Sequence, residues 1–381
     1  MNEGPQPVRD AISLPHDPAP GEAAGGGLDT FVPPTPQQFQ QLLDAHPLRP
    51  PSKLLLWLPI IGLGAVLLLA LTAEHLWSLL GMILAVAAVI IAVQYRVRQV
   101  RQLEAQTARV QELAMLRRYR EALRLAWRTL PRCVSLPDLY HRQVAAMSQS
   151  LDALRCHEAA IIGYSRLLDH VPSDHPGALH VRMLKAIAEL SSDQLADADD
   201  ELRRLHQWGV DREPESDTPS GERSEGNEDA GESASGKASR QNAAALAVTR
   251  AGYHLACLLQ QVRTYHYADA VAGLDDLQKR LRPLGVDAGH GYGLAALACQ
   301  QQSQRLADKQ REASAAAWDS QENGRASDPD QLMEQAGQWW SRATLLLPLE
   351  RLTGRFTELS QVAEDPALTQ WARSADPPEQ S

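Results

Sequence analysis

The sequence predicts an all-α protein in which a helical membrane hairpin precedes a helical soluble region. The first observation is an almost continuous apolar block from Leu54 to Tyr95. The second is the composition, because Ala, Leu, Gln and Arg favour helices, while Phe is scarce and alternating β-branched residues are nearly absent after the block. The third is that apolar residues recur at intervals of three and four after Tyr95, which is the spacing of a helix face.

The apolar block is too long for one membrane-spanning helix. At about 1.5 Å per residue, one helix over residues 54–95 would extend roughly 60 Å, twice the hydrocarbon thickness of a bilayer. Glu74 and His75 interrupt the block and are far less costly at the membrane surface than in its core. We therefore predict a transmembrane hairpin at 53–95, with spans at 54–73 and 76–95.

Basic residues flank the block and predict its orientation. They are Arg49 and Lys53 before the first span and Arg96, Arg98 and Arg101 after the second. The turn between the spans has no Lys or Arg, so both termini are predicted to face the cytoplasm. The alternatives are a buried hairpin in a soluble protein and a signal peptide. Each apolar segment is too long for a signal core, and no small-residue cleavage site follows the first.

Three segments have the composition of chains without a core. Residues 1–52 are rich in Pro, Gly and Ala and predict a disordered cytoplasmic tail, in which a loop is favoured over a helix for the apolar patch at 36–46. Residues 211–241 are rich in Glu, Ser and Gly and predict a disordered acidic linker. Residues 375–381 predict a frayed tail.

The predicted helices lie on either side of the acidic linker and show a recurring helix–turn–helix pattern. After the linker they include helices at 267–281 and near 352–363, and the glycine-rich string at 285–293 is expected to be a flexible turn. The second helix of the pattern has a small residue, an aromatic residue four positions later, a small or apolar residue three further on, and a proline five beyond that. Two copies follow this spacing, namely Ala160, Tyr164, Leu167 and Pro172, and Ala336, Trp340, Ala343 and Pro348. Two looser copies are Ala122, Ala126, Thr129 and Pro131, and Ala270, Leu274, Leu277 and Pro283.

This pattern resembles the tetratricopeptide repeat (TPR) family. The resemblance implies a degenerate TPR-like α-solenoid, with a juxtamembrane helix and repeats at 96–210 and further repeats and capping helices at 242–374. The family's Trp, Leu-Gly and Tyr landmarks are absent from the first helices, and a generic helical bundle is the alternative. In this family the first helices line the inner groove, so the resemblance implies Arg142, Gln149 and Arg182 as partner-contact candidates. The alternative is that these three are solvated residues on a helix face.

The chain offers no motif for chemistry. Its formal net charge of −10 argues against nucleic-acid binding, and no catalytic constellation, phosphate loop or metal-ligand spacing stands out. The four cysteines, Cys133, Cys156, Cys257 and Cys299, form no CxxC pair and are predicted to be buried thiols.

We therefore expect a non-enzymatic, membrane-anchored scaffold for protein–protein interactions, without a cofactor. Its expected partners are a protein and the lipid bilayer, and the oligomeric state is left open. The alternative is an accessory subunit of a membrane enzyme or transporter complex, assembled through the hairpin.

Overall fold

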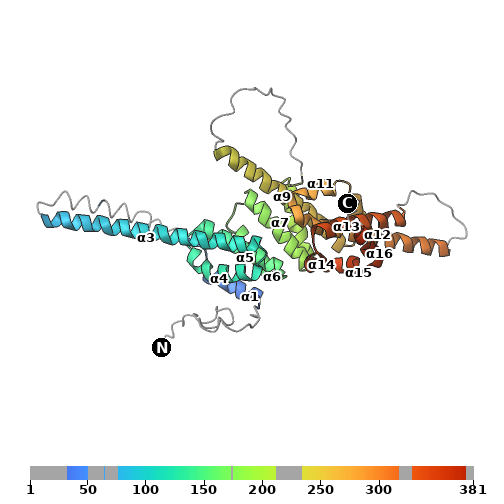
Figure 1. Cartoon of the computed structure of the whole chain (residues 1–381), viewed down its shortest axis with the longest axis horizontal. Coiled ribbons are helices and arrows are strands. Elements are labelled where there is room, and N and C mark those ends of the chain that lie inside the picture. Colours follow the sequence, from blue (N-terminus) through green and yellow to red (C-terminus); the bar gives the residue numbers. More distant parts are fainter. Residues whose placement is uncertain are drawn as a thin grey trace, which may run out of the picture. The chain divides into compact units, whose positions relative to one another are not determined.

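The computed structural model describes residues 32–49, 64, 76–172, 175–211, 234–316 and 328–374. Within these ranges every regular element is a helix and none is a strand, so the predicted all-α class is confirmed. The chain divides into two compact units, residues 1–167 and 168–381. Figure 1 labels the helices of both units.

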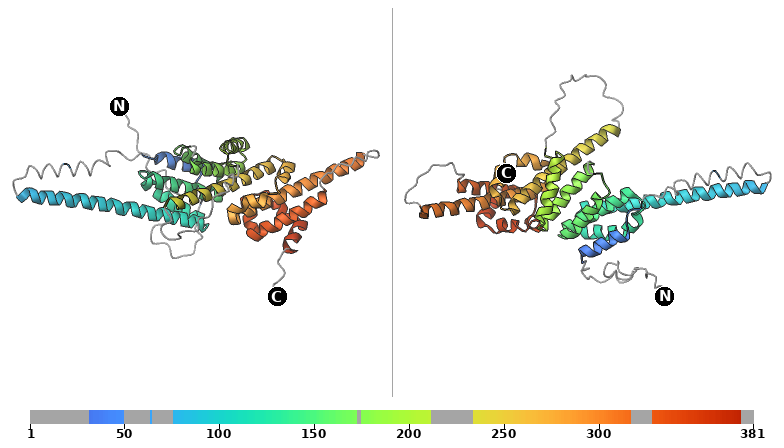
Figure 2. Two further views of the ribbon diagram at one scale, coloured as in Figure 1. Left: turned by 90° about the horizontal axis from the view of Figure 1, so that it is seen from above. Right: turned by 180° about the vertical axis from the view of Figure 1, so that it is seen from behind.

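The first unit is organised around one long helix, α3 (Leu76–Met115), whose C-terminal half packs on its neighbours. The other helices after it are α4 (Tyr119–Cys133), α5 (Pro137–Ala153) and α6 (His157–Leu168). The N-terminal part of α3 extends beyond α4 and α5 in every view (Figure 2). Helix α3 continues without a break from the segment at 76–95 to Met115, as the sequence predicted for the helix itself.

A buried polar network holds three of these helices in register. The side chain of Gln143 on α5 is fully buried, and its Nε2 donates to Thr107 Oγ1 of α3 at 3.1 Å and to Thr129 Oγ1 of α4 at 2.8 Å. Each threonine hydroxyl in turn donates to a carbonyl oxygen of its own helix. Because a buried polar group is costly without a partner, a shift of one helix along another would be penalised.

Helix α1 (Pro36–Ala45) lies where the sequence favoured a loop, and that prediction is wrong. Its N-terminus is closed by a capping box, in which Thr35 Oγ1 accepts from the Gln38 amide and Gln38 Oε1 accepts from the Thr35 amide. The apolar face, consisting of Phe39, Leu42 and Leu43, is fully buried. Tertiary packing therefore stabilises a helix that is too short to persist alone.

The contacts of α1 are with the first unit. The Phe39 ring lies 6.3 Å from the Trp127 ring of α4, measured between centroids. Asp44 pairs with Arg166 of α6 at 3.5 Å, and the Arg49 amide donates to the Val134 carbonyl at 3.0 Å. The segment that precedes the predicted hairpin is thus part of the same unit as the helix that follows it.

One turn geometry joins four successive helix pairs along the chain. It connects α3 to α4, α5 to α6, α7 (Pro176–Ser191) to α8 (Leu195–Gln207), and α9 (Ala234–Arg263) to α10 (Tyr267–Ala272). The central turn residues, all with φ between 60° and 63°, are Arg117, Arg155, Asp193 and Tyr265. In each turn the next residue donates its amide to the carbonyl five positions earlier, at 2.8 or 2.9 Å. This is the hydrogen bond of a Schellman C-cap.

The start of the second helix repeats as well. The residue five positions after each positive-φ residue is a buried alanine, and these alanines are Ala122, Ala160, Ala198 and Ala270. Each of them donates its amide to the carbonyl four positions earlier, at 3.0 or 3.1 Å. The first three turns are spaced 38 residues apart. The chain therefore repeats one helix–turn–helix form four times.

The second unit contains α7 to α10 and a C-terminal group of shorter and longer helices. These are α11 (Leu277–Leu281), the 3-10 helix η1 (Arg282–Asp287), α12 (Ala288–Ala316), α13 (Pro329–Leu346), α14 (Leu349–Arg355), α15 (Leu359–Glu364) and α16 (Pro366–Ser374). Helix α7 packs against α8 and α9, and α12 packs along α13, which also contacts α16. Most of the buried apolar side chains of this unit form one continuous core.

Several predicted boundaries in this unit are corrected by the structure. The helix expected at 267–281 breaks after Ala272, and the one expected near 352–363 breaks at Phe356, whose ring is fully buried against His290. Helix α9 begins at Ala234, inside the range predicted as linker. In the first two cases an apolar side chain at the break is buried, namely Leu274 or Phe356, so tertiary packing overrides helix propensity.

The glycine-rich string that was expected to be a flexible turn is mostly the first part of α12. Gly291 shows why glycine is needed there, because a Cβ atom at this position would collide with Leu281 and would closely approach Leu255. The absent side chain lets α12 lie directly against α11 and α9.

Parts of the predicted organisation lie outside the described residues. They are the first span at 54–73 apart from Gly64, most of the tail at 1–52, residues 212–233 of the linker and the tail at 375–381. Among the residues that the structure does describe, no helix is both long enough and apolar enough to cross a membrane.

Two adjacent tryptophans on α13 provide a test of the core. Trp340 is fully buried, whereas Trp339 is only partly buried and stacks on Tyr292 with 5.4 Å between ring centroids. We expect Trp340→Ala to lower the free energy of unfolding by about 3 to 5 kcal/mol. Trp339→Ala should cost about 1 kcal/mol, because it mainly loses an aromatic pair. Urea unfolding of the full chain in detergent, followed by circular dichroism, compares both with the parent. Equal losses would contradict the assigned core.

Candidate functional site

The first candidate surface is the exposed apolar part of α3. Six large apolar side chains are between 38% and 66% exposed, namely Val86, Ile90, Ile91, Val93, Tyr95 and Val97. Successive helix residues point about 100° apart, so the four consecutive exposed apolar residues Ile90, Ile91, Ala92 and Val93 point in all directions around the helix. A helix that is apolar all round normally lies inside a protein or a membrane. This surface therefore needs an apolar environment that the described residues do not supply.

The character of α3 changes over a few turns. After Val97 the next large apolar residues become progressively covered, and Val110 and Leu113 lie in the core of the first unit. Between the apolar part and the packed part lies a polar stretch that contains Arg98 and Arg101, both exposed. The helix thus has an apolar stem at 86–97, a basic stretch and a packed base.

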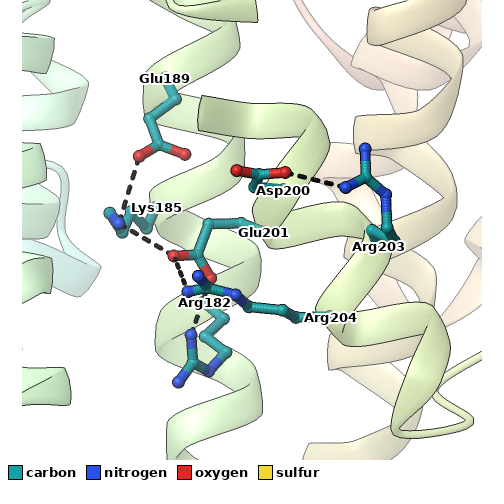
Figure 3. Close-up of polar contacts among 7 residues, drawn as sticks. All are labelled: Arg182, Lys185, Glu189, Asp200, Glu201, Arg203 and Arg204. Atoms are coloured by element: carbon teal, nitrogen blue, oxygen red, sulfur yellow. Dashed lines mark hydrogen bonds and ion pairs between the residues drawn. The ribbon is translucent and has the colours of Figure 1, made fainter. Parts of the chain in front are cut away.

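The second candidate site is a charged cluster between α7 and α8 (Figure 3). The Glu201 carboxylate of α8 is almost fully buried and receives three cationic side chains. Arg182 Nη1 lies 2.9 Å from Glu201 Oε2, and Lys185 Nζ and Arg204 Nη1 lie 3.0 and 3.2 Å from Oε1. Lys185 also lies 3.3 Å from Oε1 of Glu189 on its own helix.

Glu189 pairs with only one residue of the cluster, Lys185. Its side chain is 2% exposed, and its Oε2 has no hydrogen-bond partner among the described residues. Burial raises the pKa of Glu189 to about 7, although Lys185 opposes this shift. The carboxyl group is therefore half protonated near neutral pH.

The other two central groups keep their charges. Burial alone would raise the pKa of Glu201, but hydrogen bonds from Lys185 and Arg182 outweigh it and hold that pKa below its ordinary value. Burial would lower the pKa of Lys185, but the two glutamates outweigh it and raise that pKa. The ion pairs of this cluster hold α7 and α8 together. The cluster contains no nucleophile next to a general base, so its geometry offers no catalytic group.

The three predicted partner-contact residues have different surroundings. Arg142 and Gln149 are exposed and lie seven residues apart on α5, so they share one face of that helix. Arg182 belongs to the second unit and is only 14% exposed, because it pairs with Glu201. The guanidinium of Arg182 is thus engaged by Glu201 of the same unit and is largely covered.

Sequence reasoning missed Lys185, Glu189 and Glu201 as a cluster. A signal was present, because Glu201 follows Ala198 by three residues and so lies on the apolar face of its helix. A charged residue on an apolar face requires a partner of opposite charge. The identity of that partner depends on how α7 packs on α8.

The described residues show no further chemistry. No group of three or more His, Cys, Asp or Glu side chains among them could hold a metal ion. All four cysteines are free thiols, and Cys133 and Cys299 are buried as predicted, whereas Cys156 and Cys257 are partly exposed. No protein-family model, curated protein or solved structure matches this chain.

The raised pKa of Glu189 predicts a pH dependence of stability. Its ordinary pKa is 4.5, so between about 4.5 and 7 the folded state binds more protons than the unfolded state. The free energy of unfolding therefore falls as pH rises through this window. In Glu189→Gln this decrease in the free energy of unfolding between about pH 4.5 and 7 should be absent. Urea midpoints of the full chain in detergent at pH 5 and pH 8 measure it.

Glu201→Gln serves as the matched control for this experiment. Because the pKa of Glu201 is lowered, its stabilising effect is lost only as pH falls below about 4.5. This variant should be less stable than the parent at both pH values. The difference in its free energy of unfolding between pH 5 and pH 8 should equal that of the parent. Identical slopes in the parent and in Glu189→Gln would refute the assignment.

Proposed function

We propose that this protein is a membrane-anchored, non-catalytic scaffold in which a transmembrane hairpin at 53–95 holds a TPR-like helical domain at the membrane surface. The single observation that carries the proposal is that the apolar stem of α3 is exposed all round, while the same helix continues into a packed unit. A bilayer provides the apolar environment that such a stem requires.

The packing of α1 supports an even number of crossings. Helix α1 precedes the apolar block, α4 follows it, and the two pack together through Phe39 and Trp127. Two segments in one compact unit lie on the same side of any membrane that the chain crosses. The block at 54–95 has room for two spans, which agrees with a hairpin and with both termini in the cytoplasm.

The repeated helix pairs support the role of scaffold. Four consecutive pairs use one turn geometry with a buried alanine at the same position. Arrays of such pairs present long helical surfaces that suit a peptide or helix of a partner protein. Within the first unit, the exposed face with Arg142 and Gln149 is the proposed contact surface for that partner.

Topology reporters test the anchoring. Fusions at Asp29 and at Ser381 should both report the cytoplasm, and the full chain should stay with membranes after an alkaline carbonate wash, because the apolar stem would be embedded. The matched control is a chain that lacks residues 54–95, which should be released by the wash. Release of the full chain, or export of either fusion, would contradict the proposal.

Site-specific photocrosslinking tests the contact surface. A photoreactive residue at Gln149 should yield a discrete protein adduct in native membranes, since this side chain is exposed on the proposed face. The same residue at Arg120, which is exposed on α4, is the control and should not. Deleting residues 54–95 separates the two functional alternatives. If the adduct forms only when the hairpin is present, the alternative of a subunit assembled through the hairpin is favoured.

A further inference from the structure

The basic stretch of α3 overlaps the last residues of its apolar stem and continues beyond it. It contains Arg96, Arg98 and Arg101, all exposed, and none of them forms an ion pair with another described residue. From Leu76 to Leu103 the helix has no acidic residue at all, and Glu104 is the first. We call these three arginines the collar.

Two exposed arginines beyond the collar have acidic partners close by. Arg109 pairs with Glu112 at 2.7 Å, and Arg118 pairs with Glu121 at 2.6 Å, in both cases three residues apart. The collar has no such partner among the described residues, so an anionic partner for it would lie outside them.

The height of the collar matches a layer of lipid headgroups. At about 1.5 Å per residue, Arg96 and Arg101 are separated by roughly 7.5 Å along the helix axis. The headgroup region adds about 5 to 8 Å on each side of the hydrocarbon core. Tyr95, which is exposed next to the collar, is of the aromatic type that prefers this interface. Glu104 lies roughly 13 Å beyond Tyr95 and so outside the layer.

The three arginines point in directions that suit contact with a layer of lipid headgroups. At about 100° per residue, Arg98 and Arg101 point roughly 60° apart, while Arg96 points about 140° to 160° away from both. A protein partner or a single phosphate would contact one side of the helix. A sheet of headgroups surrounds the helix and meets arginines on every side, and each guanidinium can bind phosphate oxygens through two hydrogen bonds.

We infer that the collar binds the phosphate groups of anionic phospholipids and fixes the depth at which α3 leaves the bilayer. This inference rests on the proposed membrane anchoring. It adds a lipid class to that proposal, because three unpaired cations favour a net negative headgroup over a zwitterionic one.

Spin-labelled lipids provide the test. The full chain is reconstituted into phosphatidylcholine vesicles that contain trace spin-labelled phosphatidylglycerol or phosphatidylcholine, and the motionally restricted fraction of each is measured. The parent should prefer phosphatidylglycerol. Each arginine near an anionic surface contributes roughly a fivefold change in association. The variant R96Q/R98Q/R101Q should therefore lose most of the preference.

A second triple variant controls for net charge. R109Q/R120Q/R203Q removes three exposed arginines outside the collar and should keep the preference. Circular dichroism verifies that both variants remain helical. If the parent stays in vesicles after an alkaline wash but shows no preference, or if both variants behave alike, the inference is overturned and the anchoring stands. If the parent is washed off the vesicles, the proposed function itself fails.

Discussion

The contact between α1 and α4 is the constraint on which the proposed topology depends. Phe39, Leu42 and Leu43 are removed from water, and burying each such side chain contributes about 1.5 to 3 kcal/mol before the cost of ordering the helix. This burial ties the chain before the apolar block to the unit after it. Without it, residues before the block could lie on either side of a membrane. A ten-residue helix thus determines how the longest helix can be placed.

The sequence predicted the repeated helix pairs of this fold better than it predicted the turn conformations, helix α1 or the helix breaks. Ala122, Ala160 and Ala270 stood out by spacing, and all three occupy one position in a repeated turn, which Ala198 also occupies. The positive-φ residues of those turns were not predicted, because arginine, aspartate and tyrosine rarely adopt that conformation and carry no signal for it. Helix α1 and the break at Phe356 were missed for another reason, since their conformations follow from burial against distant residues.

The charged cluster also depends on contacts between residues that are distant in sequence, so it could not be predicted from the sequence. Arg182 was expected to be exposed from its register in a helix, yet its environment is decided by Glu201 on the next helix. Arg142 and Gln149 have no such neighbour and are exposed, as their register indicated. A buried cluster of this kind adds little net stability, because desolvation offsets the attraction. We infer that the cluster helps to set the register of α7 on α8, because sliding one helix along the other would separate Arg182 and Lys185 from Glu201.

In the proposed arrangement, helix α3 passes through three environments. An α-helix satisfies its backbone hydrogen bonds internally, so its backbone is equally compatible with lipid, headgroups and a protein core. Only the side chains have to change along it, from the apolar stem through Arg98 and Arg101 to the buried Val110. Because no break separates these parts, any change in the depth of the stem would move the packed base with it. In the proposed arrangement the collar therefore sets the distance between the helical domain and the membrane.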